Sequence, residues 1–139
     1  MFTLSILTPE KRLVTEQEIE EVVVPGYLGQ LDFLPGHAPL VTTLQAGVLR
    51  YRLKGEGQFK SVAVSWGYAE VNQTGVVVLA ETAETPQEID RHRAEEALKK
   101  SLDYLGRMTV EPAEITKYQR KIDRAQARLD LINEDKLSH

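Results

Sequence analysis

Four basic side chains recur at helical spacing near the C-terminus, and their pattern is the first in the chain that could bind a ligand. Lys117, Lys121, Arg124 and Arg128 stand at positions i, i+4, i+7 and i+11, so a helix would place them on one face. Ammonium and guanidinium groups in such a stripe suit phosphates or carboxylates. The pattern is typical of a solvated charged face, and the alternative is a surface for an acidic partner or a phosphate.

Residues that could carry catalysis or hold a metal are scarce. The chain has no cysteine, which excludes disulfides and thiolate metal sites. Its histidines, His37, His92 and His139, lie far apart, and no pair has the spacing of metal ligands. There is no phosphate-binding loop, nucleophile elbow or GxGxxG motif. We therefore expect no catalytic residue, no metal site and no required cofactor.

Composition and charge indicate a globular chain built in two parts. Of the 139 residues, 42% are hydrophobic and 27% are charged, and the net charge of −4 argues against a nucleic-acid partner. No apolar run approaches the roughly 20 residues that span a bilayer, and the N-terminus resembles neither a signal nor a transit peptide, so we expect a bacterial cytoplasmic origin without membrane insertion. Residues 1–85 hold 6 basic and 10 acidic side chains, whereas residues 86–139 hold 11 of each. This shift predicts two domains, 1–85 and 86–139.

The first part has the pattern of β-structure. Phe2, Leu4 and Ile6 alternate with polar residues, as in a half-buried strand. Trp66 continues a second alternation, with the valines at 62 and 64, which favours the core or an interface over a stacking platform. Turn residues at 55–57 and 72–75 separate such runs. We expect an antiparallel β-sandwich, or flattened barrel, at the N-terminus.

The second part has the pattern of two helices. Thr85, Pro86 and Glu88 form a favourable helix start, and Gly106 is a natural stop. The first helix then carries a narrow apolar stripe: Ala94, Ala97, Leu98, Ser101, Leu102 and Leu105. A second helix from Pro112 carries a heptad seam: Ile115, Tyr118, Ile122, Ala125, Leu129 and Ile132. The short link predicts an antiparallel two-helix hairpin, whose alanine-bearing contacts would let it open without unfolding the β region.

Five strings of the sequence form a recognisable set. They are Val22-Val23-Val24-Pro25-Gly26, Leu34-Pro35-Gly36-His37-Ala38-Pro39-Leu40, Leu44-Gln45-Ala46-Gly47-Val48-Leu49, Val64-Ser65-Trp66-Gly67-Tyr68-Ala69-Glu70-Val71 and Val76-Val77-Val78-Leu79-Ala80-Glu81-Thr82-Ala83-Glu84. Together they resemble one family, the epsilon subunit of F-type ATP synthases. The resemblance runs in order over nearly the whole chain, and its most specific part is the Pro35-Gly36-His37 string.

The resemblance implies a non-catalytic rotor subunit at the cytoplasmic face of the bacterial membrane. It implies that the sandwich contacts the gamma subunit and the membrane-embedded c-ring and helps to couple ion flow to rotation. It also implies that the hairpin can extend toward the alpha and beta subunits and inhibit ATP hydrolysis. The c-ring contact would be Tyr27, Leu28, Gly29 and Gln30, the gamma contact His37, Ala38 and Leu40, and the contact to an acidic segment of beta the basic stripe of Lys117, Lys121, Arg124 and Arg128.

Some members of this family bind regulatory ATP, and the motif associated with that property is present here. Ile89-Asp90-Arg91-His92-Arg93-Ala94 matches it in full. The resemblance therefore implies an ATP site of Glu84, Ile89, Asp90, Arg93, Ala94, Arg124 and Arg128. Lys100 stands where the family has a further arginine, and a lysine cannot make a two-pronged contact. Asp90 and Arg93 are also spaced as an ordinary i, i+3 ion pair.

Asp32 is a second departure from the family pattern, which usually has glycine at this position. The departure leaves the detail of the neighbouring turn open.

Two other classes of function are compatible with the residues alone. One is a free-standing interaction module whose hairpin binds some other helical or acidic partner, which would be a stable monomer without affinity for a gamma subunit. The other is an unrecognised hydrolase, which activity of the isolated chain would reveal.

Overall fold

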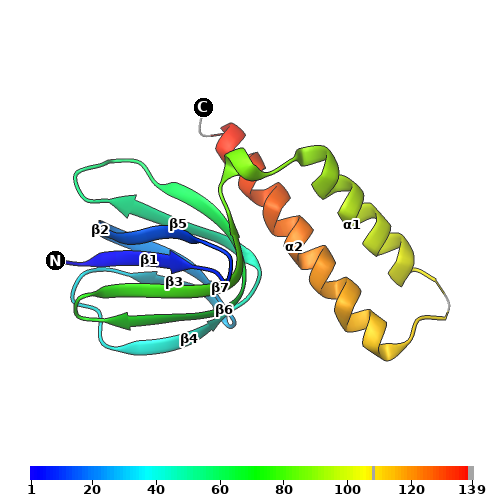
Figure 1. Ribbon diagram of the computed structural model, residues 1–139, viewed down its shortest axis with the longest axis horizontal. Coiled ribbons are helices and arrows are strands. Elements are labelled where there is room, and N and C mark those ends of the chain that lie inside the picture. The colour runs from blue at the N-terminus through cyan, green and yellow to red at the C-terminus, as the bar shows by residue number, and fades with distance from the viewer. Residues whose placement is uncertain (108, 138–139) are drawn as a thin grey trace.

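The computed structural model describes residues 1–107 and 109–137, with the side chains described up to Glu134. His139 lies outside these residues. Seven strands come first and two helices follow (Figure 1). The strands are β1 (Thr3–Leu7), β2 (Arg12–Gly26), β3 (Gly29–Phe33), β4 (Leu40–Leu44), β5 (Gly47–Leu53), β6 (Lys60–Asn72) and β7 (Gly75–Glu84). A 3-10 turn, η1 (Pro86–Glu88), leads to α1 (Arg91–Leu105) and α2 (Pro112–Leu137).

The strands form a flattened barrel, which confirms the predicted sandwich. Neighbouring strands run in the order β1-β7-β6-β4-β2-β3, and β5 bridges β2 and β6. Pairing of β1 with β2 closes the sheet on itself. Most pairs are antiparallel, but β1 runs parallel to β7, with Thr3 opposite Gly75 and Leu7 opposite Leu79. Closure leaves few free edges, which protects a small sheet from pairing with other chains.

The main core lies entirely inside the barrel. It follows from the two-residue alternation of the strands, because every second side chain of β1 points inward: Leu4 and Ile6 are fully buried. Phe33 is the largest fully buried side chain. No residue of either helix belongs to this cluster. The sandwich therefore has a core of its own, independent of the hairpin.

The first helix begins later than the sequence indicates. Thr85 and Glu88 do pair as expected, since the Glu88 carboxylate accepts from the Thr85 N–H at 3.1 Å, but they cap only η1. The backbone then turns extended at Ile89, whose side chain packs against the sandwich. Asp90 restarts the helix as its N-cap and accepts from the Arg93 N–H at 3.1 Å. Burial of one isoleucine thus overrides a favourable helix start.

The second helix has two buried faces rather than one. The predicted seam toward α1 includes Ala125 and Leu129, which are buried. Ala127 and Leu131, spaced i, i+4 on another face, are buried as well. Leu131 is fully buried in a small second cluster with Val48 and Ala63, with Ile89 beside it. This cluster is where the hairpin docks on the outside of β5 and β6.

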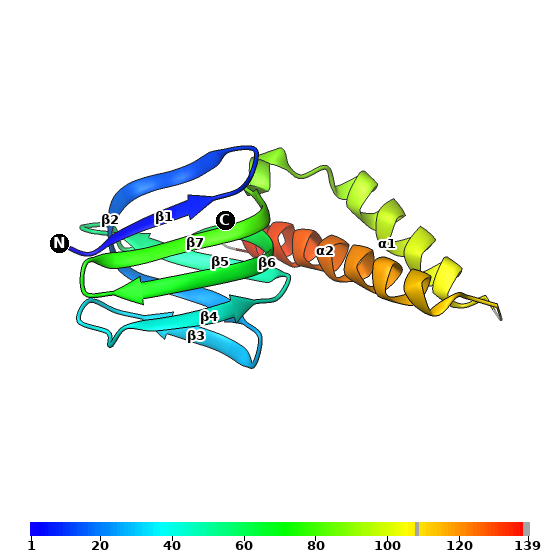
Figure 2. The same cartoon turned by 60° about the horizontal axis from the view of Figure 1, so that its bottom comes forward.

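The first helix packs mainly on α2, which lies between it and the sandwich in Figure 1. Figure 2 shows both helices projecting side by side from one end of the sandwich. Ala94 and Ser101 are buried in this contact. Leu102, predicted to lie in the stripe, is 52% exposed. Each helical residue turns by about 100°, so a helix that buries Ser101 points Leu102 away. Neither helix, over the described residues, is long and apolar enough to cross a membrane.

Candidate functional site

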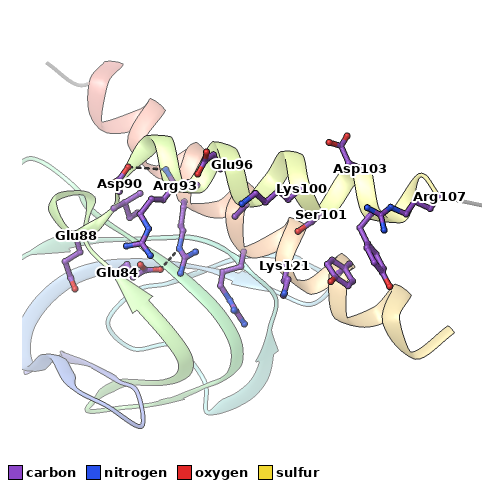
Figure 3. A pocket seen from close by; sticks show the side chains of 17 residues that line it. Glu84, Glu88, Asp90, Arg93, Glu96, Lys100, Ser101, Asp103, Arg107 and Lys121 are labelled. Carbon is purple, nitrogen blue, oxygen red and sulfur yellow. Dashed lines mark hydrogen bonds and ion pairs between the residues drawn. The ribbon is translucent and has the colours of Figure 1, made fainter. Parts of the chain in front are cut away.

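A cleft of about 1000 Å³ opens between the two helices and the end of β7. Its size falls at the upper end of small-molecule sites, about 300–1000 Å³. Figure 3 shows Arg93 and Lys100 projecting from α1, with Glu84 below them at the end of β7. The lining residues are Glu84, Glu88, Ile89, Asp90, Arg93, Ala94, Glu96, Ala97, Lys100, Ser101, Asp103, Tyr104, Arg107, Tyr118, Lys121, Arg124 and Arg128. All seven residues predicted to bind ATP are among them.

Several cations in this cleft lack a partner carboxylate. Among the described residues, the side chains of Arg93, Lys100, Lys121 and Arg124 form no ion pair. The Nε atom of Arg124 is buried and has no hydrogen-bond partner in the described structure. Buried polar groups normally have partners, and like charges in one cleft repel one another. The arrangement therefore favours an anion that could satisfy several of these groups together.

Two carboxylates at the base of the cleft are already paired. Arg128 Nε donates to Glu84 Oε1 at 2.7 Å, which links α2 to β7. Lys11 Nζ donates to Glu88 Oε2 at 2.6 Å. The Lys11 ammonium, with the Thr85 backbone N–H, holds the pKa of Glu88 below its usual range, so this carboxylate stays ionised at neutral pH. Glu84 and Glu88 thus fix the sandwich side of the cleft.

Asp90 serves a structural purpose in this arrangement. Its carboxylate caps α1, and no ion pair between Asp90 and Arg93 is present in the described structure. The i, i+3 ion pair that the spacing also allowed does not form. Instead, the cap leaves the Arg93 guanidinium unpaired and pointing into the cleft (Figure 3).

A stacked pair of tyrosines closes the other end of the cleft. The rings of Tyr104 and Tyr118 lie 4.0 Å apart between centroids and are inclined by 18°. The Lys121 ammonium lies 4.8 Å from the centre of the Tyr118 ring, and the Arg107 guanidinium 5.2 Å from that of Tyr104. Both distances are within the range of cation–π attraction. Flat aromatic faces beside free cations suit a ligand that combines a ring with phosphates.

The basic stripe of α2 is divided between environments in this conformation. Lys121, Arg124 and Arg128 turn into the cleft, while Lys117 lies outside it, 5.7 Å from the centre of the Tyr118 ring. Arg124 and Arg128 are partly buried. The four cations therefore do not form one continuous exposed surface while the hairpin is docked.

The turn between β2 and β3 carries two strongly exposed apolar side chains. Tyr27 is 70% exposed and Leu28 is 96% exposed. Gly29 takes a φ of +129°, which glycine tolerates, and together with Gln30 it begins β3. An exposed apolar turn of this kind is typical of a contact surface.

His37 shapes the loop before β4. Its ring packs edge-on against Phe33 with centroids 5.0 Å apart, and its Nδ1 lies 2.6 Å from the Ala38 carbonyl oxygen, to which it donates. This contact orients the chain as it enters β4, where Leu40 is 39% and Val41 65% exposed. His37 thus supports an exposed apolar surface as well as lying beside it.

Comparison with known proteins decides the family. The model of the ATP synthase Delta/Epsilon chain beta-sandwich domain matches residues 1–86. An ATP synthase epsilon chain from Bdellovibrio bacteriovorus is 40% identical over 127 residues, 91% of each chain. A second, from Syntrophotalea carbinolica, is 42% identical over 128 residues, 92% of this chain and 91% of the relative. This chain belongs to the epsilon-subunit family of F-type ATP synthases.

Solved structures share the fold of this epsilon subunit. A chain in the Euglena gracilis mitochondrial ATP synthase aligns with a TM-score of 0.79 and 19% identity, over 93% of this chain and 79% of that one. A chain of the Tetrahymena thermophila mitochondrial ATP synthase aligns with a TM-score of 0.64 and 11% identity, over 94% and 96%. Strands and both helices are therefore common to distant relatives.

Part of the cleft of this epsilon subunit escaped sequence reasoning. Tyr104, Arg107 and Tyr118 line the cleft but were not predicted as site residues. Tyr118 stands at a seam position, which also suits helix packing, and no sequence pattern marked Tyr104 or Arg107. Lys121 was assigned to a protein contact on the basic stripe, yet it lines the cleft. Lys100 does line the cleft, at the position where the family has arginine. Over residues 1–107 and 109–134, whose side chains are described, no three His, Asp or Glu side chains are grouped so as to hold a metal ion.

Proposed function

We propose that this epsilon subunit is a regulatory rotor component that senses nucleotide through its hairpin. The cleft carries the proposal, because Arg93, Lys100, Lys121 and Arg124 line it without partner carboxylates. A nucleoside triphosphate supplies up to four negative charges and a flat base. Charge-assisted bonds to its phosphates would offset the repulsion among these cations. Bound ATP would therefore favour the docked hairpin seen here.

In the released state the hairpin would inhibit ATP hydrolysis by the assembled synthase. The docking contact is small: one cluster around Leu131 and a few ion pairs, of which Arg120 with Glu81 is at the surface. Surface ion pairs contribute only about 0–1 kcal/mol each. Two states separated by so little are suited to a switch. Release would expose Arg124 and Arg128, which with the already exposed Lys117 and Lys121 would form one basic surface for an acidic segment of the beta subunit.

The sandwich would provide the permanent contacts of the subunit with the rotor. The exposed apolar turn of Tyr27 and Leu28 suits the c-ring, and the surface around His37 and Leu40 suits the gamma subunit. Through these partners, and through the alpha and beta subunits, the chain would help to couple ion translocation to ATP synthesis. This assignment places it peripherally at the cytoplasmic face of the bacterial membrane, with no active site of its own and ATP as a regulator only.

Calorimetry with ATP on the full chain tests the nucleotide site. Arg93→Ala should weaken binding at least about tenfold, since it removes a charged partner of the phosphates. Arg91→Ala is the matched control: Arg91 lies two residues away on the same helix, outside the cleft, where it donates to Asn133 at 3.1 Å. Equal effects of the two changes, or tight binding by Arg93→Ala, would exclude this site.

Assembly with gamma tests the regulatory role. A chain truncated after residue 85 should still bind the gamma subunit, because the sandwich core contains no helical residue. The reconstituted synthase should then hydrolyse ATP faster than the complex with the full chain. Unchanged hydrolysis would exclude inhibition by the hairpin, while failure to bind gamma would exclude the rotor role.

A further inference from the structure

Trp66 stands where the alternation of β6 breaks. Val62 and Val64 point into the barrel, and so do Ala69 and Val71, but these pairs differ in parity. The change of phase falls at Trp66, whose φ is +28°, and at the glycine that follows, whose φ is +147°. At this point β6 also exchanges its neighbour β5 for β4. Residues other than glycine rarely adopt a positive φ, and those that do are concentrated at functional positions.

The break turns Trp66 out of the core and toward α2. The guanidinium of Arg120 lies 4.3 Å from the centre of its ring, and that of Arg124 lies 5.4 Å away. Both are within about 6 Å, the range of cation–π attraction, and tryptophan is the strongest aromatic partner. The only tryptophan of the chain therefore forms a platform for two arginines of the hairpin.

The two arginines differ in what else they contact. Arg120 also pairs with Glu81 at 3.6 Å and does not line the cleft. Arg124 lines the cleft and forms no ion pair in the described structure. The indole face is thus the contact that orients Arg124, while Trp66 itself stays outside the cleft. Arginine donors that are not used by the ring remain available to a ligand.

We propose that Trp66 is a positioning residue for nucleotide binding: the indole face holds the Arg124 guanidinium ready for the phosphates. This inference rests on the proposed function of the cleft and names a sandwich residue on which that function depends. It also couples ATP binding in the cleft to docking of the hairpin on the sandwich. If Arg124 binds phosphate best while stacked on Trp66, ATP must favour docking as strongly as docking favours ATP.

A double-mutant cycle tests this inference by calorimetry with ATP. Trp66→Leu keeps an apolar side chain but removes the ring, and should weaken ATP binding about tenfold. Trp66→Phe retains an aromatic face and should stay within about threefold of wild type. In an Arg124→Gln background, Trp66→Leu should weaken ATP binding further by less than about twofold, because the guanidinium that the ring positions is already absent.

Arg120→Gln is the matched control, since Arg120 stacks on the same ring but lies outside the cleft. In that background Trp66→Leu should still weaken binding about tenfold. If Trp66→Leu were equally harmful with and without Arg124, the tryptophan would act through general packing and the inference would be wrong. Wild-type affinity in Trp66→Leu would also overturn it, leaving the nucleotide site intact. No ATP binding by the wild-type chain would overturn both.

The fluorescence of Trp66 gives a second readout that a purely structural role would not move. ATP should change its emission in the wild-type chain, because the phosphates alter the position of the stacked guanidinium. Arg124→Gln should abolish the change, and Arg120→Gln should retain it. A change of emission that Arg124→Gln retains and Arg120→Gln abolishes would contradict the role of Arg124. Circular dichroism would verify that each variant is folded.

Discussion

Leu131 should control whether the hairpin stays docked on the sandwich. Its side chain is completely buried. It does not belong to the main core but to the small cluster with Val48 and Ala63. Leu131→Ala removes three carbon atoms. At about 0.8 kcal/mol per buried carbon plus a cavity term, the loss is about 3 kcal/mol. The docking equilibrium should therefore shift about a hundredfold toward release.

Native-state hydrogen exchange measures this shift directly. Amides of α2 that exchange through release should exchange about a hundredfold faster in Leu131→Ala, while those of β1 and β7 should keep their protection. Quenching of Trp66 by acrylamide should increase in parallel, because Arg120 and Arg124 leave its ring on release.

Leu102→Ala is the matched control for this experiment. It makes the same chemical change on the neighbouring helix, but Leu102 is 52% exposed and lies outside the docking cluster. Its effect on exchange should correspond to less than about 0.5 kcal/mol. Equal acceleration of β1, β7 and α2 in Leu131→Ala would show one cooperative core, and unchanged α2 amides would show that the cluster does not hold the hairpin. Either result would refute the separation of the two parts.

Three further changes test local features of the fold. Loss of hydration, followed by the hydrogen bond and charge of Glu21, raises the pKa of Asp32 to about 6 from a usual value of 3.8. Between these pH values the folded chain binds a proton that the unfolded chain does not. Asp32→Asn should therefore be more stable than wild type at pH 8, and the difference in unfolding free energy should shrink toward pH 5. The same difference in urea melts at both pH values would contradict this. A Cβ at Gly67 would lie 1.9 Å from the Leu79 carbonyl oxygen, so Gly67→Ala should lower the melting temperature by at least about 5 °C, and an unchanged temperature would argue against the kink in β6. Asp90→Ala should cost about 1 kcal/mol through the lost cap, visible as reduced protection of the first turn of α1, whereas Asp90→Ser should retain most of it.

Sequence patterns predicted the elements that have strong periodicity and missed those that do not. The burial of β1 alternates strictly, so its strand could be recognised. In β3 and β4 only the last residue of each strand, Phe33 or Leu44, is buried, and no alternation marks them. β3 is held by a hairpin with the neighbouring β2, in which Gly26 lies opposite Gly29. β4 is held by β6, with Leu40 opposite Val71, and so depends on a partner distant in sequence.

The candidate site shows the same limit more sharply. No spacing rule connects Glu84 with Arg93 or Arg128; only the resemblance joined them before the structure placed them around one cleft. The stacking of arginines on Trp66 was not predicted, because the side chain follows a backbone kink that falls where β6 changes neighbours. Ile89 likewise ended a favourable helix start because of a cluster formed by three distant segments.

The unpaired cations of the cleft and the small docking cluster bear on one equilibrium. Arg93 comes from α1, Lys121 and Arg124 come from α2, and their mutual repulsion acts against closing the hairpin. Leu131 acts in the opposite direction by fixing α2 to the sandwich. An anion in the cleft removes the first effect without altering the second, so its binding energy appears directly as stability of the docked state. Under the proposed function, the chain would respond to nucleotide concentration through this electrostatic effect, while the β core, which contains no helical residue, stays the same.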